Sequence, residues 1–152
     1  MKNNLKPAEK ARGYAFLLLK YRLRSEQELV VRMSRKKFPA DVIRETISFL
    51  KEKKFIDDQA FARSWVESRW HKAIGPRRLR QELRLKGIDT ETIEQSLGDL
   101  KEGHRQREAI QELIQLRLAR LKGLDPQTAR RRLYAYLVRR GFSPEEIIDC
   151  LP

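Results

Sequence analysis

Cysteine, histidine and long apolar runs are scarce in this sequence of 152 residues. The single cysteine, Cys150, excludes an intramolecular disulfide and a cysteine-rich zinc site. The longest apolar run near the N-terminus covers residues 14–19, far fewer than the roughly 20 residues that span a bilayer. Its charged flanks do not suit a signal peptide either. We therefore expect a cytoplasmic protein with no membrane segment.

Features of catalytic sites are equally scarce. His71 and His104 are the only histidines, and neither has a nucleophile or a metal-ligand pattern beside it. The sequence has no glycine-rich phosphate-binding motif of the G-x-x-x-x-G-K-[ST] or G-x-G-x-x-G type. Asp57 and Asp58 could hold a cation, but as the cap and first turn of a helix they already have a structural role. We predict no catalytic residue, no cofactor and no metal site.

Positive charge is present in excess. The chain has 34 Lys and Arg against 21 Asp and Glu, a formal net charge of +13. The excess falls in three windows, residues 20–37, 69–86 and 117–140, whose net charges are +5, +6 and +7. Such periodic charge on an elongated body predicts a long anionic partner or an acidic protein surface.

Three copies of one apolar pattern follow one another along the chain. Their anchors are Phe38, Ile88 and Phe142, which lie 50 and 54 residues apart. Apolar residues recur nine and five positions before each anchor and five and nine positions after it. They are Leu29, Leu79 and Leu133; Met33, Leu83 and Leu137; Ile43, Ile93 and Ile147; and Ile47, Leu97 and Leu151. Because these spacings place each set on one face of a helix, every copy is predicted to be helical.

Capping signals predict where the middle helix of each copy begins. Ser25 and Glu28 form a capping-box pattern in the first copy. Gly75-Pro76 takes that place in the second copy, and Asp125-Pro126 in the third. The third signal comes four residues earlier in register, so its helix should be about one turn longer.

Glycine marks the predicted ends of two of these helices. Gly87 and Gly141 lie at the predicted helix ends, where the backbone commonly adopts a left-handed conformation that glycine favours. The first copy has Lys37 at that place, which predicts a slightly strained or differently shaped turn.

A further helix fits before each middle helix, over residues 8–22, 57–72 and 105–122. Valine is scarce and no strand pattern is visible. The predicted fold is all-α: three tandem three-helix repeats that form an elongated, curved, right-handed-type helical array. The repeats are expected over residues 1–53, 54–103 and 104–152, as one continuous structural unit.

Basic residues on and before the second and third middle helices are the candidate contacts for a partner. Leu79 and Leu83 should face the core, which leaves Arg77, Arg80 and Arg84 on a separate face. The alternative is that these side chains only solvate their helices and cover apolar surface with their stems. The basic candidates are Arg69, Lys72, Arg77, Arg78, Arg80, Arg84, Lys86, Arg130, Arg131, Arg132, Arg139 and Arg140.

Two aromatic residues complete the candidate set. Trp70 lies beside the apolar stripe of its helix, among basic residues, and could anchor an interface. Tyr134 and Tyr136 straddle the core phase, so we expect one of them to face outward, with Tyr134 as the candidate contact.

Several motifs carry a resemblance to a known family. They are Ser25-Glu26-x-Glu28-Leu29; Phe55-Ile56-Asp57-Asp58-x-x-Phe61-Ala62; Arg69; Gly75-Pro76-x-x-Leu79-x-x-Glu82-Leu83-x-x-Lys86-Gly87-Ile88; and Leu137-x-x-Arg140-Gly141-Phe142. Together these residues resemble the RecX family of bacterial recombination regulators over nearly the whole chain. The sequence departs from the family pattern at Lys37, in place of a turn glycine, and at Ile74 before Gly75.

The resemblance implies three-helix repeats without enzyme activity. It also implies binding in the groove of the RecA filament on single-stranded DNA. Such binding would restrain the ATPase, strand-exchange and co-protease activities of RecA, and so modulate DNA repair and homologous recombination. We expect a monomer that binds DNA weakly and without sequence preference. The alternative is an autonomous, sequence-independent DNA-binding protein of helix-turn-helix-like type. Against it, no single recognition helix stands out and no dimerisation heptad is present.

Overall fold

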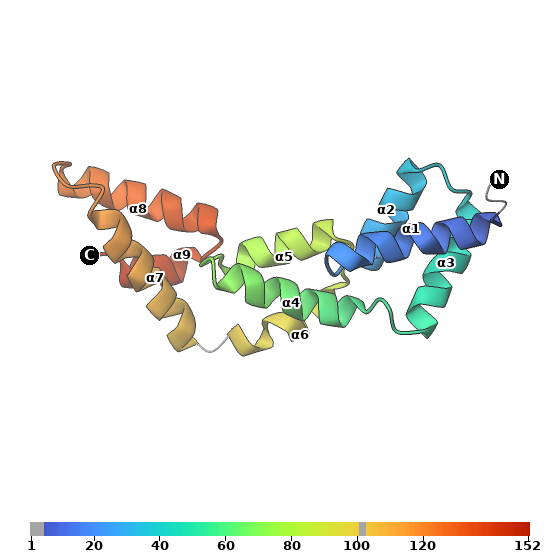
Figure 1. Cartoon of the computed structure of the whole chain (residues 1–152). Helices are drawn as coiled ribbons and strands as arrows, with labels where there is room; N and C mark the ends of the chain where they lie inside the picture. The colour runs from blue at the N-terminus through green and yellow to red at the C-terminus, as the bar shows by residue number, and fades with distance from the viewer. Residues whose placement is uncertain (1–4, 101–102) are drawn as a thin grey trace.

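The structure is a computed structural model that describes residues 5–100 and 103–152 (Figure 1). The regular elements of these residues are all helical. The helices are α1 (Pro7–Tyr21), α2 (Glu26–Arg35) and α3 (Ala40–Glu52); α4 (Asp58–Trp70), α5 (Pro76–Leu85) and α6 (Thr90–Leu97), with a 3-10 turn over Gly98–Leu100; and α7 (Gly103–Leu118), α8 (Pro126–Arg140) and α9 (Pro144–Cys150). Three successive triplets confirm the predicted all-α fold of three tandem three-helix domains.

Each triplet encloses its own hydrophobic core. The middle helices contribute the leucines and the methionine that the repeat pattern placed nine and five positions before each anchor. All of these side chains are buried: Leu29, Met33, Leu79, Leu83, Leu133 and Leu137. The third helices close the cores with Ile43, Ile93 and Ile147. The helical periodicity of the sequence therefore identifies the buried face of each domain.

The middle helices begin where their capping signals predict. Ser25 Oγ accepts a hydrogen bond from the Glu28 backbone N–H at 3.2 Å, and Asp125 accepts one from the Thr128 N–H at 3.0 Å. Helix α8 has 15 residues against ten in α2 and α5, which confirms its predicted extra length. By contrast α7 ends at Leu118, earlier than predicted, because the chain already turns at residues 119–124.

The same junction joins the first domain to the second and the second to the third. At both places the N-terminus of one middle helix meets the C-terminus of the next domain's middle helix. Ser25 Oγ, at the start of α2, donates to the Lys86 carbonyl at the end of α5 at 2.7 Å. The Gly75 N–H, at the start of α5, donates to the Arg140 carbonyl at the end of α8 at 2.7 Å. The positive end of one helix dipole thus lies against the negative end of the next, which is a favourable arrangement.

These junctions explain where glycine is required. Gly141 has a φ of +97°, and a Cβ placed on it would lie 2.5 Å from the Cβ of Arg78 in the neighbouring domain. A Cβ on Gly87, where φ is +78°, would meet the side chain of Gln27. Lys37 also has a left-handed φ, of 63°, but its side chain is exposed. The turn therefore has the same left-handed backbone as those at Gly87 and Gly141, and of the two alternatives expected here it is slightly strained rather than differently shaped, since a lysine occupies this backbone at a small cost.

The triplets follow one another in an elongated, curved body (Figure 1). Its concave upper edge in that view carries α8, α5 and α2 one after another, while α6 and the lower part of α7 lie on the opposite side. The repeated junction therefore aligns the most basic segments of the sequence along a single edge.

Candidate functional site

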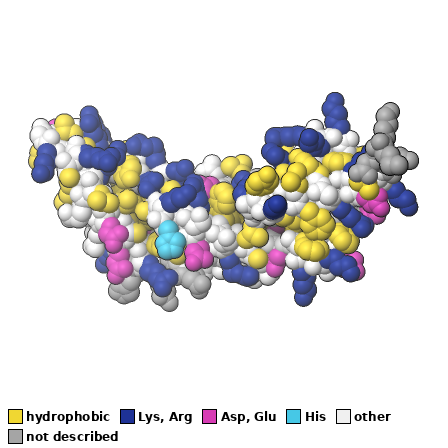
Figure 2. Space-filling model, viewed as in Figure 1, with side chains coloured by type: hydrophobic (Ala, Val, Ile, Leu, Met, Phe, Trp, Pro, Cys, Tyr) yellow, Lys and Arg dark blue, Asp and Glu magenta, His cyan; other side chains and the backbone are white. Residues whose placement is uncertain are grey.

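The edge formed by α8, α5 and α2, here called the basic edge, holds most of the candidate residues. Figure 2 shows Lys and Arg side chains gathered along it, with the visible Asp and Glu mostly lower on the same face. Exposed basic side chains on it include Arg32 and Arg35 of α2, Arg77 and Arg84 of α5, and Arg130, Arg131, Arg132 and Arg139 of α8. The structure thus brings basic residues that are distant in sequence onto one edge of the molecule.

On α5 the predicted face of three arginines divides in two. Arg77 and Arg84 are exposed. Arg80 is half-buried, and its Nε lies 2.7 Å from the Glu94 carboxylate of α6. This hydrogen bond to Glu94 raises the pKa of Arg80. The three arginines are therefore not equally available to a partner, because Glu94, 14 positions later in the sequence, pairs with Arg80 and holds it against the domain.

Two further candidates, Arg69 and Arg78, converge on Glu82. Arg69 Nε donates to Glu82 at 2.8 Å, Trp65 Nε1 at 3.0 Å and Arg78 Nε at 3.1 Å. Burial alone would raise the pKa of Glu82, but these hydrogen bonds outweigh it and the pKa is lowered. Both arginines therefore have a structural role within the second domain, and any contact with a partner is additional to it.

The junction between the second and third domains accounts for several other candidates. The Arg140 guanidinium donates to the Lys72 carbonyl at 2.8 Å, and the Arg78 guanidinium donates to the Arg139 carbonyl at 3.4 Å. The side chains of Lys72 and Arg139 are themselves exposed. Trp70 is half-buried and packs against the cores of both domains. Its position explains why it lies off the apolar stripe of its own helix: it connects two domains.

The two tyrosines of α8 are both half-buried against the third core. The guanidiniums of Arg117 and Arg140 lie over the Tyr136 ring, 4.4 and 5.6 Å from its centroid, and so cover this ring. Tyr134 lines a shallow cleft of about 510 Å³ with Arg130, Arg131 and Ile148.

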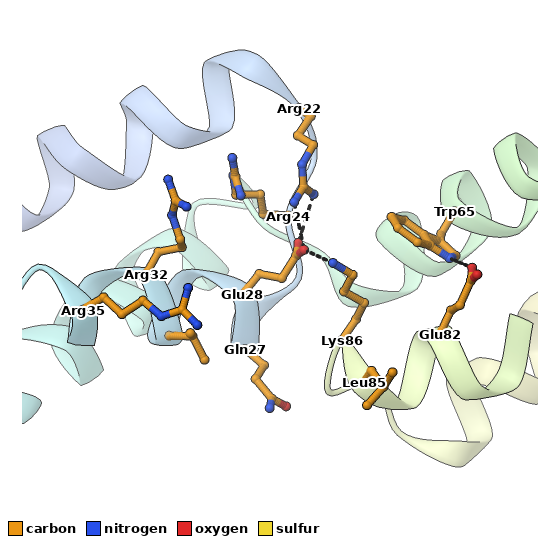
Figure 3. Close-up of a pocket in the computed structure, with 11 residues that line it drawn as sticks. Arg22, Arg24, Gln27, Glu28, Arg32, Arg35, Trp65, Glu82, Leu85 and Lys86 are labelled. Carbon is orange, nitrogen blue, oxygen red and sulfur yellow. Dashed lines mark hydrogen bonds and ion pairs between the residues drawn. The ribbon is translucent and has the colours of Figure 1, made fainter.

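A larger cleft of about 560 Å³ lies between the first and second domains, where α2 approaches α5 (Figure 3). Its basic residues are Arg22, Arg24, Arg32, Arg35 and Lys86. Of these five, the candidate set contained Lys86 alone. The net charge of +5 in residues 20–37 was the signal that could have led to the four arginines.

Glu28 occupies the centre of this cleft, between Arg22 and Lys86 (Figure 3). It accepts hydrogen bonds from the Arg22 guanidinium at 2.9 and 3.1 Å and from Lys86 Nζ at 2.5 Å. Burial opposes ionisation of Glu28, but these bonds and the Ser25 N–H bring its pKa down to about 2. Lys86 is therefore a connection between domains, since it reaches from the end of α5 to the first turn of α2.

Neither a metal centre nor a membrane span is found in the part of the chain that the structure describes. No group of three or more His, Cys, Asp or Glu side chains in this part is arranged to hold a metal ion. No helix in it is long and apolar enough to cross a bilayer. The geometry is that of an extended basic surface, a type of surface suited to binding anionic partners.

Comparison with known proteins identifies the same three domains. Models of the first, second and third three-helix domains of RecX match residues 11–50, 57–97 and 105–151. "Regulatory protein RecX" of Streptomyces coelicolor is 33% identical over 138 residues, which cover 90% of this chain and 73% of that protein. The one from Mycolicibacterium smegmatis is 36% identical over 146 residues, which cover 93% and 77%. The crystal structure of RecX from Lactobacillus salivarius has a TM-score of 0.84 at 25% identity and covers 95% of this chain and 94% of that one. The chain thus belongs to the RecX family of regulatory proteins.

Proposed function

We propose that this protein binds the RecA filament on single-stranded DNA and restrains its ATPase, strand-exchange and co-protease activities. The proposal includes that it acts in the cytoplasm, as a monomer, by binding and without catalysis. The observation that carries it is the basic edge. Three middle helices in a row place exposed arginines along one side of an elongated body, which suits a long, repetitive and anionic partner.

The exposed arginines of α5 lie at the centre of this edge, so they are the best place to test the proposal. Arg77 and Arg84 are exposed, and no described residue forms an ion pair with either side chain. Replacing them leaves the Arg69–Glu82 and Arg80–Glu94 pairs intact. The double variant Arg77→Glu with Arg84→Glu should therefore remain folded, with stability within about 0.5 kcal/mol per substitution.

The experiment is a titration of the single-stranded-DNA-dependent ATPase of RecA with substoichiometric amounts of this protein in about 0.1 M salt. The wild-type protein should inhibit well below the concentration that coats bare DNA, and the double variant should inhibit much less. Lys10→Glu with Arg63→Glu is the matched control, because both residues are exposed on α1 and α4, helices that do not form the basic edge. This control changes the net charge by the same amount as Arg77→Glu with Arg84→Glu, and it should inhibit the ATPase like the wild-type protein.

Two results would contradict the proposal. Full inhibition by a folded Arg77→Glu, Arg84→Glu variant would remove the centre of the basic edge from the mechanism. Inhibition that begins only once the protein has saturated the DNA would favour the alternative, an autonomous, sequence-independent DNA-binding protein that competes with RecA for DNA.

A further inference from the structure

The cleft between α2 and α5 contains more guanidiniums than its carboxylates pair with. Its two carboxylates are engaged: Glu28 with Arg22 and Lys86, and Glu82 with groups of the second domain. No carboxylate of the described residues forms an ion pair with Arg24, Arg32 or Arg35, and Arg24 Nε donates instead to the Leu18 carbonyl at 3.4 Å. Burial and then the positive charge of Arg22 lower the pKa of Arg24. The remaining N–H groups of these three arginines are available to pair with an anionic ligand.

The same cleft exposes aliphatic side chains. Leu85 of α5 is 76% exposed and Val31 of α2 is 38% exposed, and both line the hollow. Figure 3 shows Leu85 below Lys86, across the hollow from Arg32 and Arg35. A cleft with an exposed leucine on one side and guanidiniums on the other suits a ligand that offers both carboxylates and an apolar side chain.

The one aromatic ring of the cleft is not open for stacking. Trp65 packs against Phe61 with a centroid distance of 5.8 Å. Lys86 Nζ lies over its ring at 5.1 Å, and its indole N–H is bonded to Glu82. A nucleic-acid base needs a free aromatic face for the stacking that single-strand sites use. The lining therefore favours a peptide over a nucleotide.

We propose that the α2–α5 cleft is a binding site for an acidic peptide segment of a partner protein that carries an aliphatic side chain. Carboxylates of the segment pair with Arg24, Arg32 and Arg35, since a guanidinium binds a carboxylate through two parallel hydrogen bonds. The aliphatic side chain packs between Val31 and Leu85. This inference does not rest on the proposed function, because binding of a peptide requires only this chain.

The test is fluorescence anisotropy with the full chain and a labelled synthetic peptide of alternating Glu and Leu. A second peptide has Ser in place of every Leu, and so keeps the charge but loses the apolar side chains. A labelled single-stranded oligodeoxynucleotide of equal charge is the third probe. We expect the Glu–Leu peptide to bind at least about tenfold more tightly than the Glu–Ser peptide.

Matched variants then locate the site. Leu85→Ser should weaken binding of the Glu–Leu peptide about tenfold or more, whereas Leu116→Ser on α7, where the leucine is 72% exposed, should leave it unchanged. Arg32→Ala with Arg35→Ala should weaken it about tenfold or more. Arg130→Ala with Arg131→Ala on α8, with the same loss of charge, should change it much less. Circular dichroism and thermal melting of each variant verify that it is folded.

Three results would overturn the inference. Equal binding of the Glu–Leu and Glu–Ser peptides would mean attraction by charge alone. An equal loss of peptide affinity in the α2 and α8 double variants would mean that no particular cleft is involved. If Arg32→Ala with Arg35→Ala weakened only oligodeoxynucleotide binding, the cleft would be a nucleic-acid site. Each of these results leaves inhibition of RecA to be measured separately, so failure of this inference and failure of the proposed function are distinguishable.

Discussion

Replacing Glu28 by glutamine should destabilise the junction between the first and second domains in a pH-dependent way. Glutamine keeps an oxygen for the Ser25 N–H, so the capping box persists, but the charge facing Arg22 and Lys86 is lost. The pKa of Glu28 falls from about 4.5 to about 2. At about 1.36 kcal/mol per pKa unit, this drop sets an upper bound of about 3.4 kcal/mol on the stabilisation. Arg22 is 44% exposed, so solvent screening should reduce the measured loss to about 1–2 kcal/mol.

The direction of the pH dependence follows from the lowered pKa of Glu28. A carboxylate with a depressed folded-state pKa stabilises the protein fully above its unfolded pKa, and the stabilisation is lost as the pH falls through the folded value. The difference in unfolding free energy between the wild type and Glu28→Gln should therefore be largest at pH 7. It should shrink between about pH 4.5 and pH 2, because protonated Glu28 resembles glutamine.

Urea unfolding followed by circular dichroism at several pH values measures this difference. Glu146→Gln is the matched control, since Glu146 forms the same capping box with Ser143 and no described residue makes an ion pair with it. Its effect on the unfolding free energy should be smaller than that of Glu28→Gln. A Glu28→Gln loss that stays constant from pH 7 to pH 2.5 would refute the reasoning, as would a loss equal to that of Glu146→Gln.

Two further substitutions test the junction and the repeat register. Gly141→Ala should lower the unfolding free energy by about 1–2 kcal/mol for a left-handed alanine and by a further 1–3 kcal/mol, roughly, for overpacking against Arg78. Gly123→Ala is the control and should lower it only by the amount for a left-handed alanine, because φ there is +90° and the space around it is open. If urea unfolding gave the same loss for both variants, the close approach of Gly141 to Arg78 would be contradicted. Leu83→Ala should lower the unfolding free energy by about 2–5 kcal/mol, because it leaves a cavity in the core. Leu85→Ala, at an exposed leucine of the same helix, should change it by no more than about 0.5 kcal/mol. A neutral Leu83→Ala would contradict the register of the repeats.

The sequence by itself determined the helices, their caps and their buried faces. Ser25 and Glu28 close a capping box with their own neighbouring backbone, and Leu79 and Leu83 fall on one side of α5 because the helix has 3.6 residues per turn. Such features depend on residues a few positions apart, so local periodicity and spacing are sufficient to predict them. The family resemblance rests on the same residues.

Only the tertiary structure decided which charges are free. Arg77 and Arg80 are alike in sequence, but Glu94 of another helix pairs with Arg80 and leaves Arg77 exposed. In the α2–α5 cleft, Lys86 meets Glu28 across 58 positions of the chain. Long side chains find partners by proximity in space, which depends on how whole helices are placed. Periodicity therefore predicts the core of this protein, and only the packing of its domains defines its charged surface.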